Sequence, residues 1–425
     1  NSNGITLENA NYTAGLQGRF TGSVTIFYTR DATQEARWNE NATWTRSDIL
    51  NTSHDPHDSR QPASNRVPGE GDVAVIGWIP WTDAGRSNVW NSTLRIYEDL
   101  RGQPHGVWLR DRREVAEVVF TKMTDEDGNP VERNYRSNFQ FRPTLIINNT
   151  DSENGVLIAK LVKGEGLFWN RGSDPDYTLM DIGDFAREPE SYVIYENFDD
   201  NRVINNTPAL FPNLYIANDG WGSNNKNVTF SKNIETTGNL ELLGNINLIL
   251  PTGQTGNITI GRNLVMFTEG QSGGGAEIRY SHTGQSRKIV VNGDLIMENA
   301  NSLINVTNNN STLEHELHVG GDIIQNATGA SLNLWRASER ARITLYLNGD
   351  KSMEYNRNAG NVPNFYRIVV NKGNSINTTA TFNNSYTLYG PTSGVDVAKA
   401  LELQNGLFIH NTTSDLTLTS GNDYF

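Results

Sequence analysis

A short motif recurs at a constant interval in the C-terminal half of the chain, and it restricts the fold more than any other feature. In its first two copies, residues 291–295 and 319–323, the motif reads apolar residue, variable residue, Gly, Asp, apolar residue. A third copy, residues 347–351, ends in Lys. The aspartates lie 28 and 28 residues apart, and a strand–turn–strand unit at such a fixed period is typical of a solenoid. We therefore predict stacked coils with one interior column of Val291, Val319 and Leu347 and a neighbouring column of Leu295 and Ile323.

The composition agrees with a chain that turns often. About one residue in eight is Asn and 39 residues are Gly, and both residue types form turns through their own backbone chemistry. From about residue 225 onward, short segments alternate between apolar and polar residues, which is the pattern of a strand. The clearest are residues 239–243, 246–250, 258–260 and 288–291. The sequence thus predicts an all-β fold, a right-handed parallel β-helix (β-solenoid) with a Trp-rich N-terminal cap region.

Two regions are expected along the chain. Residues 1–65 are interpreted as an N-terminal lead-in or cap region, and residues 66–425 as the solenoid. We expect the whole to be a fragment of a longer protein. Short helices are expected only around residues 336–342 and 395–400.

A longer super-repeat overlies the coils, near residues 190–250 and 350–410. It rests on the similarity between the segment at 210–216 and the segment at 364–370. The pattern predicts that the chain passes through the same larger unit twice.

The charge balance excludes several classes of partner. The chain has 35 Lys and Arg against 48 Asp and Glu, a formal net charge of −13, whereas nucleic acid requires a basic face. We expect no nucleic-acid partner. No apolar stretch approaches the roughly 20 residues of a membrane helix, so we expect no membrane insertion. The absence of cysteine excludes disulfides and cysteine–zinc sites. The fifteen Asn-x-Ser/Thr sequons are interpreted as chance products of an Asn- and Thr-rich chain.

Several segments taken together resemble a known family. They are Trp38 and Trp44, residues 67–73, the Val-x-Gly-Asp-Leu coils, residues 211–216 and residues 401–409. Over most of its length the chain is similar to the β-helical segments of very large Bacteroidota surface proteins, including type IX-secreted adhesins of the gliding-motility kind. The resemblance implies a structural or adhesive segment, without catalysis, that is exported across the outer membrane to the cell surface. The implied partners are surface glycans or other cell-surface and outer-membrane proteins, and the export machinery of the outer membrane.

Parallel β-helices also carry polysaccharide lyases and glycoside hydrolases, so a glycan-binding or glycan-cleaving β-helix is the alternative function. Such enzymes need paired carboxylates, or a calcium-assisted base with Arg or Lys. The adjacent pair Asp199-Asp200 lies in a polar bend, and the Gly-His-Gly and Arg-Ile-Lys clusters of pectin-degrading enzymes are absent from the sequence. We therefore predict no catalytic residue and no enzyme activity.

Calcium is the one cofactor that the sequence leaves open, because oxygen ligands occur at spacings that this ion accepts. The candidate ligands are Asp174, Asp176, Asp181 and Asp184. Residues 125–129 form a similar cluster that we interpret as a turn. Residues 54–58, His-Asp-Pro-His-Asp, are interpreted as an exposed loop, because Pro56 excludes the helical spacing of a zinc site.

Three tryptophans are the candidates for a glycan-binding platform, because sugar rings stack on indole faces. They are Trp78, Trp81 and Trp90. The interpretation that we prefer is that they cap the first coil, whose open core edge must be covered.

If the coils stack in register, Asp294, Asp322 and Asp350 form a column of like charges about 4.8 Å apart. Such charges repel, and something must offset the repulsion. Either each carboxylate accepts a backbone N–H of its own turn, or calcium is shared between coils. We prefer the bond within the turn, because one Asp per coil supplies few of the oxygens that calcium needs.

Overall fold

The computed structural model describes the chain in segments. They are residues 25–30, 36–54, 56–69, 71–77, 93–95, 112–120, 144–149, 156–172, 182, 185–196, 201–205, 207–218, 225–250, 256–267, 275–280, 284–298, 303–306, 313–336, 341–373, 375–390, 399–411 and 413–418. Within them the chain forms β-strands and two short 3-10 helices, Asn41–Thr43 and Phe185–Arg187, and no α-helix. No helix in these segments is long and apolar enough to cross a membrane. The chain divides into two compact units, Asn1–Tyr195 (unit 1) and Glu196–Phe425 (unit 2).

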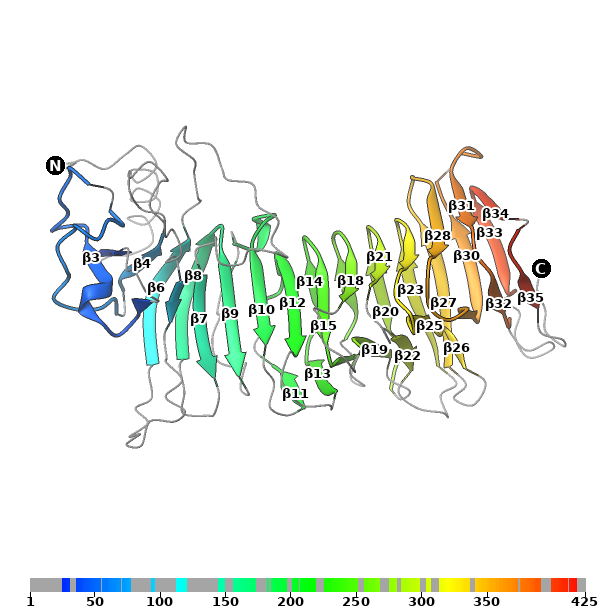
Figure 1. Ribbon diagram of the computed structural model, residues 1–425, viewed down its shortest axis with the longest axis horizontal. Helices are drawn as coiled ribbons and strands as arrows, with labels where there is room; N and C mark the ends of the chain where they lie inside the picture. The colour runs from blue at the N-terminus through cyan, green and yellow to red at the C-terminus, as the bar shows by residue number, and fades with distance from the viewer. Residues whose placement is uncertain are drawn as a thin grey trace. The chain divides into compact units, whose positions relative to one another are not determined.

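Unit 1 alternates between two sheets of mainly parallel strands (Figure 1). In the first sheet, β1, β4, β6 and β8 pair in parallel, and β3 pairs antiparallel with β1 at the edge. In the second, β2, β5, β7 and β9 pair in parallel, with β10 beside β9. The strands are β1 (Ile26–Thr29), β2 (Ala36–Arg37), β3 (Trp44–Arg46), β4 (Val73–Ile76), β5 (Thr93–Arg95), β6 (Arg112–Phe120), β7 (Thr144–Asn149), β8 (Val156–Gly164), β9 (Leu167–Gly172) and β10 (Tyr192–Glu196).

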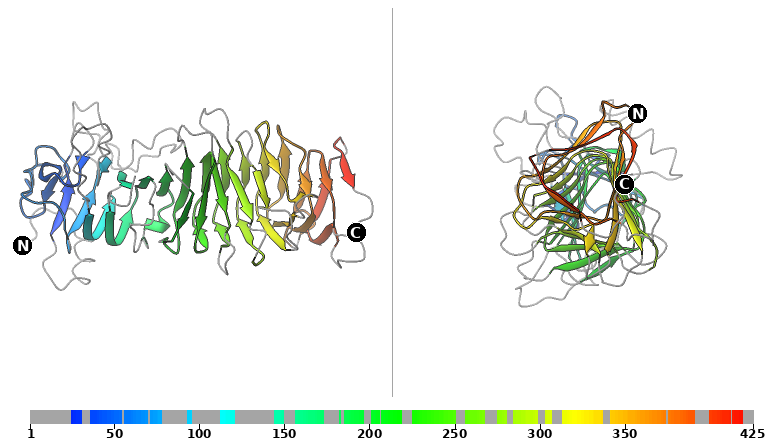
Figure 2. Two further views of the ribbon diagram at one scale, coloured as in Figure 1. Left: turned by 90° about the horizontal axis from the view of Figure 1, so that it is seen from below. Right: turned by 90° about the vertical axis from the view of Figure 1, so that its right-hand side faces the viewer.

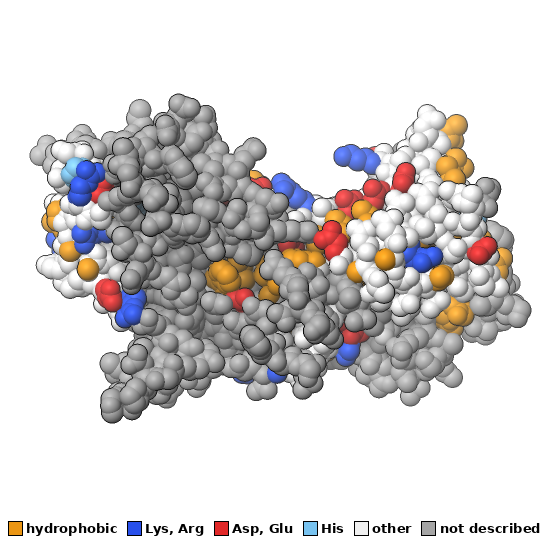
Figure 3. All heavy atoms as spheres, viewed as in Figure 1, with side chains coloured by type: hydrophobic (Ala, Val, Ile, Leu, Met, Phe, Trp, Pro, Cys, Tyr) orange, Lys and Arg blue, Asp and Glu red, His pale blue; other side chains and the backbone are white. Residues whose placement is uncertain are grey.

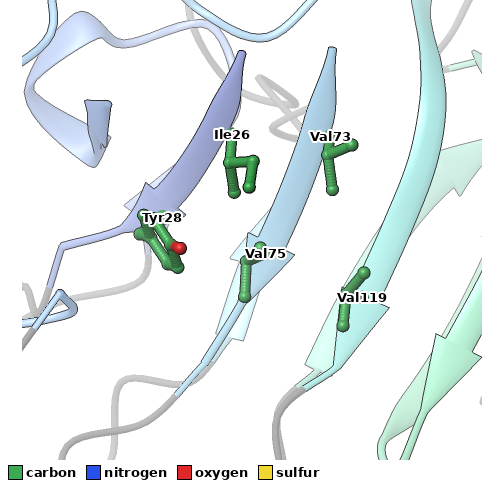
Figure 4. Close-up of a cluster of buried hydrophobic side chains, with 5 residues drawn as sticks. All are labelled: Ile26, Tyr28, Val73, Val75 and Val119. Carbon is green, nitrogen blue, oxygen red and sulfur yellow. The ribbon is translucent and has the colours of Figure 1, made fainter. Parts of the chain in front are cut away.

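Strands β1 and β4 of the first sheet of unit 1 are buried on both faces. On one face Ile26 and Tyr28 of β1 form a cluster with Val73 and Val75 of β4 and with Val119 of β6 (Figure 4). The residues between them, such as Phe27 and Ala74, face the other way and are also fully buried. Parallel sheets are usually covered on both sides, so near-continuous apolar runs such as Val-Ala-Val-Ile in β4 are expected of them.

Two tryptophans close the edge of this sheet. Trp38 and Trp44 are fully buried, with ring centroids 5.0 Å apart, and Trp44 also packs edge-on against Phe27. The indole N–H of Trp44 donates to the carbonyl of Trp38 at 2.9 Å. The antiparallel β3 thus covers the edge of β1 with aromatic side chains, and the predicted Trp-rich cap region as a whole stays a prediction. Since β1 itself pairs with β4, stacking already begins within the predicted lead-in region. The predicted boundary at residues 65 and 66 stays a prediction.

Unit 2 repeats three strands per coil, one on each of three faces. Face 1 has the strand order β14-β17-β20-β23-β27-β30-β33, face 2 the order β12-β15-β18-β21-β24-β28-β31-β34, and face 3 the order β11-β13-β16-β19-β22-β25. In the last coils a small sheet, β29-β32-β35, takes the place of face 3. Every pair with a recorded register along these orders is parallel. The strands lie side by side in both side views (Figures 1 and 2).

The strands of unit 2 are short, as the alternating segments predicted. Face 1 contains β14 (Ile234–Thr236), β17 (Ile258–Ile260), β20 (Lys288–Val291), β23 (Glu314–Val319), β27 (Ala341–Asn348), β30 (Arg367–Asn371) and β33 (Leu401–Asn405). Face 2 contains β12 (Asn213–Asn218), β15 (Leu240–Gly244), β18 (Leu264–Phe267), β21 (Leu295–Met297), β24 (Ile323–Gln325), β28 (Met353–Arg357), β31 (Thr379–Phe382) and β34 (Leu407–His410). Face 3 and the small sheet contain β11 (Arg202–Ile204), β13 (Lys226–Phe230), β16 (Ile246–Ile249), β19 (Glu277–Tyr280), β22 (Leu303–Val306), β25 (Ser331–Leu332), β29 (Asn364–Phe365), β32 (Tyr386–Leu388) and β35 (Leu416–Leu418).

The predicted interior columns are confirmed. On face 1, Val291 pairs with Val319 and Val319 with Leu347, and none of the three is more than 1% exposed. On face 2, Leu295 pairs with Ile323, and both are fully buried. The described chain is therefore all-β, and its stacked parallel strands fit a parallel β-solenoid. The right-handed sense of the coil stays a prediction.

The third copy of the motif departs from the period. Ile323 pairs with Tyr355, not with Lys351, so this coil is 32 residues long on face 2 instead of 28. The extra residues follow Asp350 and leave Lys351 exposed. An insertion at a corner is tolerated because it changes the turn without altering the columns on either side.

One weaker prediction also fails. Trp335–Arg336 (β26) and β27 form an antiparallel pair where a helix was expected around residues 336–342. Of the second predicted helix, only residues 399 and 400 are described, and they are not helical. The two copies of the super-repeat occupy different positions in their coils, since β12 lies on face 2 and β30 on face 1.

Candidate functional site

Most of the residues predicted from the sequence to form sites lie outside the described part of the chain. This holds for the calcium candidates Asp174, Asp176, Asp181 and Asp184, for the tryptophans Trp78, Trp81 and Trp90, for residues 125–129 and for Asp199 and Asp200. Their roles stay predictions.

His57 and Asp58 of the His-Asp-Pro-His-Asp segment are buried, where we expected an exposed loop. His57 is 6% exposed, and its Nδ1 lies 2.7 Å from the carbonyl of Thr29 in β1. Asp58 is 1% exposed and forms an ion pair with Arg60. Among the described residues, no group of three His, Asp or Glu side chains could hold a metal ion. The segment therefore fixes a loop onto β1 of unit 1.

A ladder of side-chain hydrogen bonds runs along the corner that leads from face 1 to face 2, which we call the 1–2 corner. At each step the Oδ1 atom of an Asn or Asp accepts the backbone N–H of the equivalent residue in the next coil. The steps are Asn213 to Asn239 (2.8 Å), Asn239 to Asn263 (3.1 Å), Asn263 to Asp294 (2.9 Å), Asp294 to Asp322 (2.8 Å) and Asp322 to Glu354 (2.7 Å). The ladder thus ties six successive coils of unit 2 together.

This ladder corrects our preferred interpretation of the aspartates. Asp294 and Asp322 accept N–H groups of the following coil, 28 and 32 residues away, and not of their own turns. The spacing of about 4.8 Å between stacked strands lets a short side chain reach the next backbone. A glycine before the ladder residue leaves room for the accepting oxygen. A Cβ at Gly321 would lie 2.1 Å from Oδ1 of Asp294, and one at Gly238 would lie 2.0 Å from Oδ1 of Asn213.

Asparagines form similar bonds between coils at other places. Oδ1 of Asn233 accepts the backbone N–H of Asn257, and Oδ1 of Asn257 accepts that of Lys288. On face 1 the residues Asn371 and Asn405 pair, and Nδ2 of Asn405 donates to Oδ1 of Asn371 at 2.9 Å. Asparagine side chains therefore hold neighbouring coils in register, a role that their interpretation as turn residues missed. The signal that could have revealed it is an Asn or Asp before each face 2 strand at intervals of 24 to 31 residues.

A buried lysine lies at the same 1–2 corner. Lys372 is fully buried, and its ammonium donates to the carbonyls of Gly320 at 2.8 Å and Asn348 at 2.5 Å, two and one coils back. Burial lowers the pKa of Lys372 to about 8, although the charges of Asp322 and Asp350 act to raise it. The corner thus contains a cation, two carbonyl oxygens and two carboxylates.

The outer surface of face 1 holds a second polar cluster. The rings of His318 and Tyr346 stack with centroids 4.3 Å apart and an interplanar angle of 7°. Nε2 of His318 lies 2.7 Å from Glu316, and Nδ1 lies 2.6 Å from the amide of Asn348. The amide nitrogen of Asn348 can only donate, so this contact favours the neutral tautomer of His318 with its proton on Nε2. Burial lowers the pKa of His318, although the hydrogen bond to Glu316 opposes this shift.

An aromatic cluster lies where the chain enters face 1 in the last coils. Trp335 of β26 is half-buried and packs on Tyr366 and Tyr389, with ring centroids 5.7 and 5.5 Å apart. The guanidinium of Arg342 lies 5.8 Å from the centre of the Tyr366 ring. The hydroxyl of Tyr366 donates to Glu314 at 2.9 Å. These residues come from four successive coils and combine the partly exposed rings of Trp335 and Tyr389 with charged hydrogen-bonding groups.

The visible described surface of unit 2 is mainly uncharged and polar, with scattered acidic and basic side chains (Figure 3). In comparisons with known proteins, no family model, curated protein or solved structure matches the chain. The chemistry of these clusters is therefore the only guide to function beyond the fold.

Proposed function

We propose that this chain is a structural or adhesive segment of an exported bacterial cell-surface protein and that it has no catalysis of its own. What supports the proposal is the 1–2 corner ladder. Its Asn and Asp oxygens are already bonded to the backbone of the next coil. Side chains with this role stiffen a long element and leave few groups at that corner to act on a substrate. The resemblance to type IX-secreted, gliding-motility-type surface proteins agrees with it.

Two measurements test this proposal. Antibodies raised against the chain should label intact cells of the source organism, and brief treatment of those cells with a protease should remove the label. The purified chain should release neither reducing ends nor unsaturated products from pectin, alginate or glycosaminoglycans. Label found only after cell lysis would contradict surface display. Product release that is lost in Asp199→Asn or Asp200→Asn would contradict the absence of catalysis.

Glycan binding is the second candidate function, and the Trp335 cluster favours it. Sugar rings stack on aromatic faces, and their hydroxyls bond to carboxylates and guanidinium groups, which is the combination that Trp335, Tyr389, Arg342 and Glu314 offer. The cluster contains one cation and one carboxylate, so its charges balance and the ligand that fits best is an uncharged polysaccharide. The sequence-based candidates Trp78, Trp81 and Trp90 remain a separate proposal for the same function.

Affinity electrophoresis tests the Trp335 cluster. The chain is run through gels that contain hydroxyethyl cellulose, xylan, galactomannan or laminarin. We expect at least one of these polymers to retard the chain, Trp335→Ala to abolish the retardation and Tyr346→Ala to retain it. Tyr346 is the matched control because it is a half-buried aromatic residue on the same face. Migration that no polymer changes, or that Trp335→Ala leaves retarded, would rule out this site.

A further inference from the structure

The 1–2 corner brings together oxygen atoms of the kind that bind metal ions, yet a side chain of the protein lies among them. Carbonyl and carboxylate oxygens are the ligands that calcium prefers in proteins. Here the carbonyls of Gly320 and Asn348 receive the ammonium of Lys372. The carboxylates of Asp322 and Asp350 act electrostatically on the same group.

The local sequence makes room for the lysine. Asn348 pairs with Asn371, so counting on by one residue places Lys372 level with Gly349. Gly349 has a φ of 93°, which favours glycine, and it brings no side chain into the corner. In the next coil Gly406 is needed as well, because a Cβ there would lie 2.8 Å from Cβ of Lys372. Glycines in neighbouring coils thus leave a channel that the lysine side chain fills.

We propose that this corner is a cation-binding site whose cation is supplied by the chain itself, namely the ammonium of Lys372. The ammonium is held by carbonyls of two successive coils, and the Asp-containing turns belong to the same corner. The wild-type corner therefore needs no metal, and calcium does not compete with a tethered ammonium. If the side chain is removed, the same oxygens form an empty site that Ca²⁺ fills. This inference concerns the stability of unit 2 and holds whether or not the chain is adhesive.

Thermal unfolding of the full chain tests the proposal. The midpoint of the wild type is expected to be the same in EDTA and in millimolar CaCl₂. Lys372→Ala should unfold at a lower temperature, because it leaves two buried carbonyls without a donor and opens a cavity. Millimolar CaCl₂ should raise the midpoint of Lys372→Ala by several degrees, whereas NaCl at the same ionic strength should not. The rise should disappear in the triple variant Lys372→Ala/Asp322→Asn/Asp350→Asn, in which neutral amides replace both carboxylates.

Two further variants make the outcome decisive. Lys351→Ala removes an exposed lysine beside Asp350 and should leave both the midpoint and its insensitivity to calcium unchanged. Lys372→Met fills the channel without a charge, so it should unfold below the wild type and ignore calcium. If Lys372→Ala folds only with CaCl₂, the proposal is supported, and if it folds with neither salt, the proposal fails. A wild-type midpoint that falls in EDTA, no calcium response in Lys372→Ala, or Lys372→Met as stable as the wild type would each overturn it.

Discussion

At the scale of single residues, the same oxygen chemistry is supplied by two side chains. Asn239 and Asn263 use an amide oxygen where Asp294 and Asp322 use a carboxylate oxygen, and the acceptor distances are between 2.7 and 3.1 Å in all four cases. The ladder therefore requires an acceptor and not a charge. This explains why the period of the motif is carried by Asp in some coils and by Asn in others.

Substitution of Asp294 separates the acceptor from the charge. Asp294→Asn keeps an Oδ1 atom for the N–H of Asp322 and should change the free energy of unfolding little. Asp294→Ala removes the acceptor and should cost about 0.5–1.5 kcal/mol, the usual net value of a hydrogen bond. Urea unfolding at pH 7 measures both. Equal losses in the two variants would mean that the charge, not the acceptor, holds the coil.

His318 predicts a dependence of stability on pH. Burial lowers the pKa of His318 in the folded state, so the unfolded chain, with an ordinary value of about 6.5, takes up the proton first. The contribution of neutral His318 to the free energy of unfolding is fully present above about pH 6.5. It is lost as the pH falls from this value toward the pKa of the folded state. His318→Phe keeps a ring on Tyr346 and cannot titrate. Urea midpoints from pH 7.5 to 5 should therefore fall less steeply in the variant, and an identical pH dependence would contradict the assignment.

At the scale of strands and corners, the sequence predicted the repeating buried columns but not the contacts at the corners between coils. The 28-residue period placed Val291, Val319 and Leu347 correctly, because a column of buried side chains imposes an apolar residue at each passage. It failed after Asp350, where the corner is four residues longer and no apolar position records the insertion. The hydrogen bonds between coils left a signal in the spacing of Asn and Asp that our reading of these residues as turn formers overlooked. The contacts of Lys372 could not be predicted, since they depend on which corners lie above one another.

The corner geometry can be tested at Gly321. In Gly321→Ala the new Cβ would meet Oδ1 of Asp294 at 2.1 Å, so the ladder bond must break or the coil must shift. We expect the free energy of unfolding to fall by about 1–3 kcal/mol, as for other overpacked sites. Gly69→Ala is the control, because its nearest atom is 3.9 Å away and its backbone needs no glycine. Chemical unfolding measures the free energy of unfolding of both variants. Equal values would show that the corner accommodates a Cβ at residue 321 without breaking the ladder bond.

At the scale of the whole molecule, stability is expected to be a sum of local terms. In stacked coils each repeat contacts mainly its neighbours, so folding energy behaves approximately as a one-dimensional series. The coils of unit 2 fit this description, because each face joins a strand to the strands of the preceding and following coils. The two compact units are each held by sheets of this kind. A substitution that destabilises one coil should therefore lower the stability of the adjacent coils most and that of distant coils least.

Leu317→Ala tests this view of the molecule. Leu317 is fully buried between Ile289 and Leu345 on face 1, so the truncation should cost about 2–5 kcal/mol. Hydrogen exchange measured by mass spectrometry should show the largest loss of protection in β20, β23 and β27. Smaller losses should follow with distance, and the first sheet of unit 1 should keep its protection. A uniform loss across both units would show instead that the molecule unfolds as a single cooperative block, because a series of nearest-neighbour terms cannot transmit a local cavity equally to every coil.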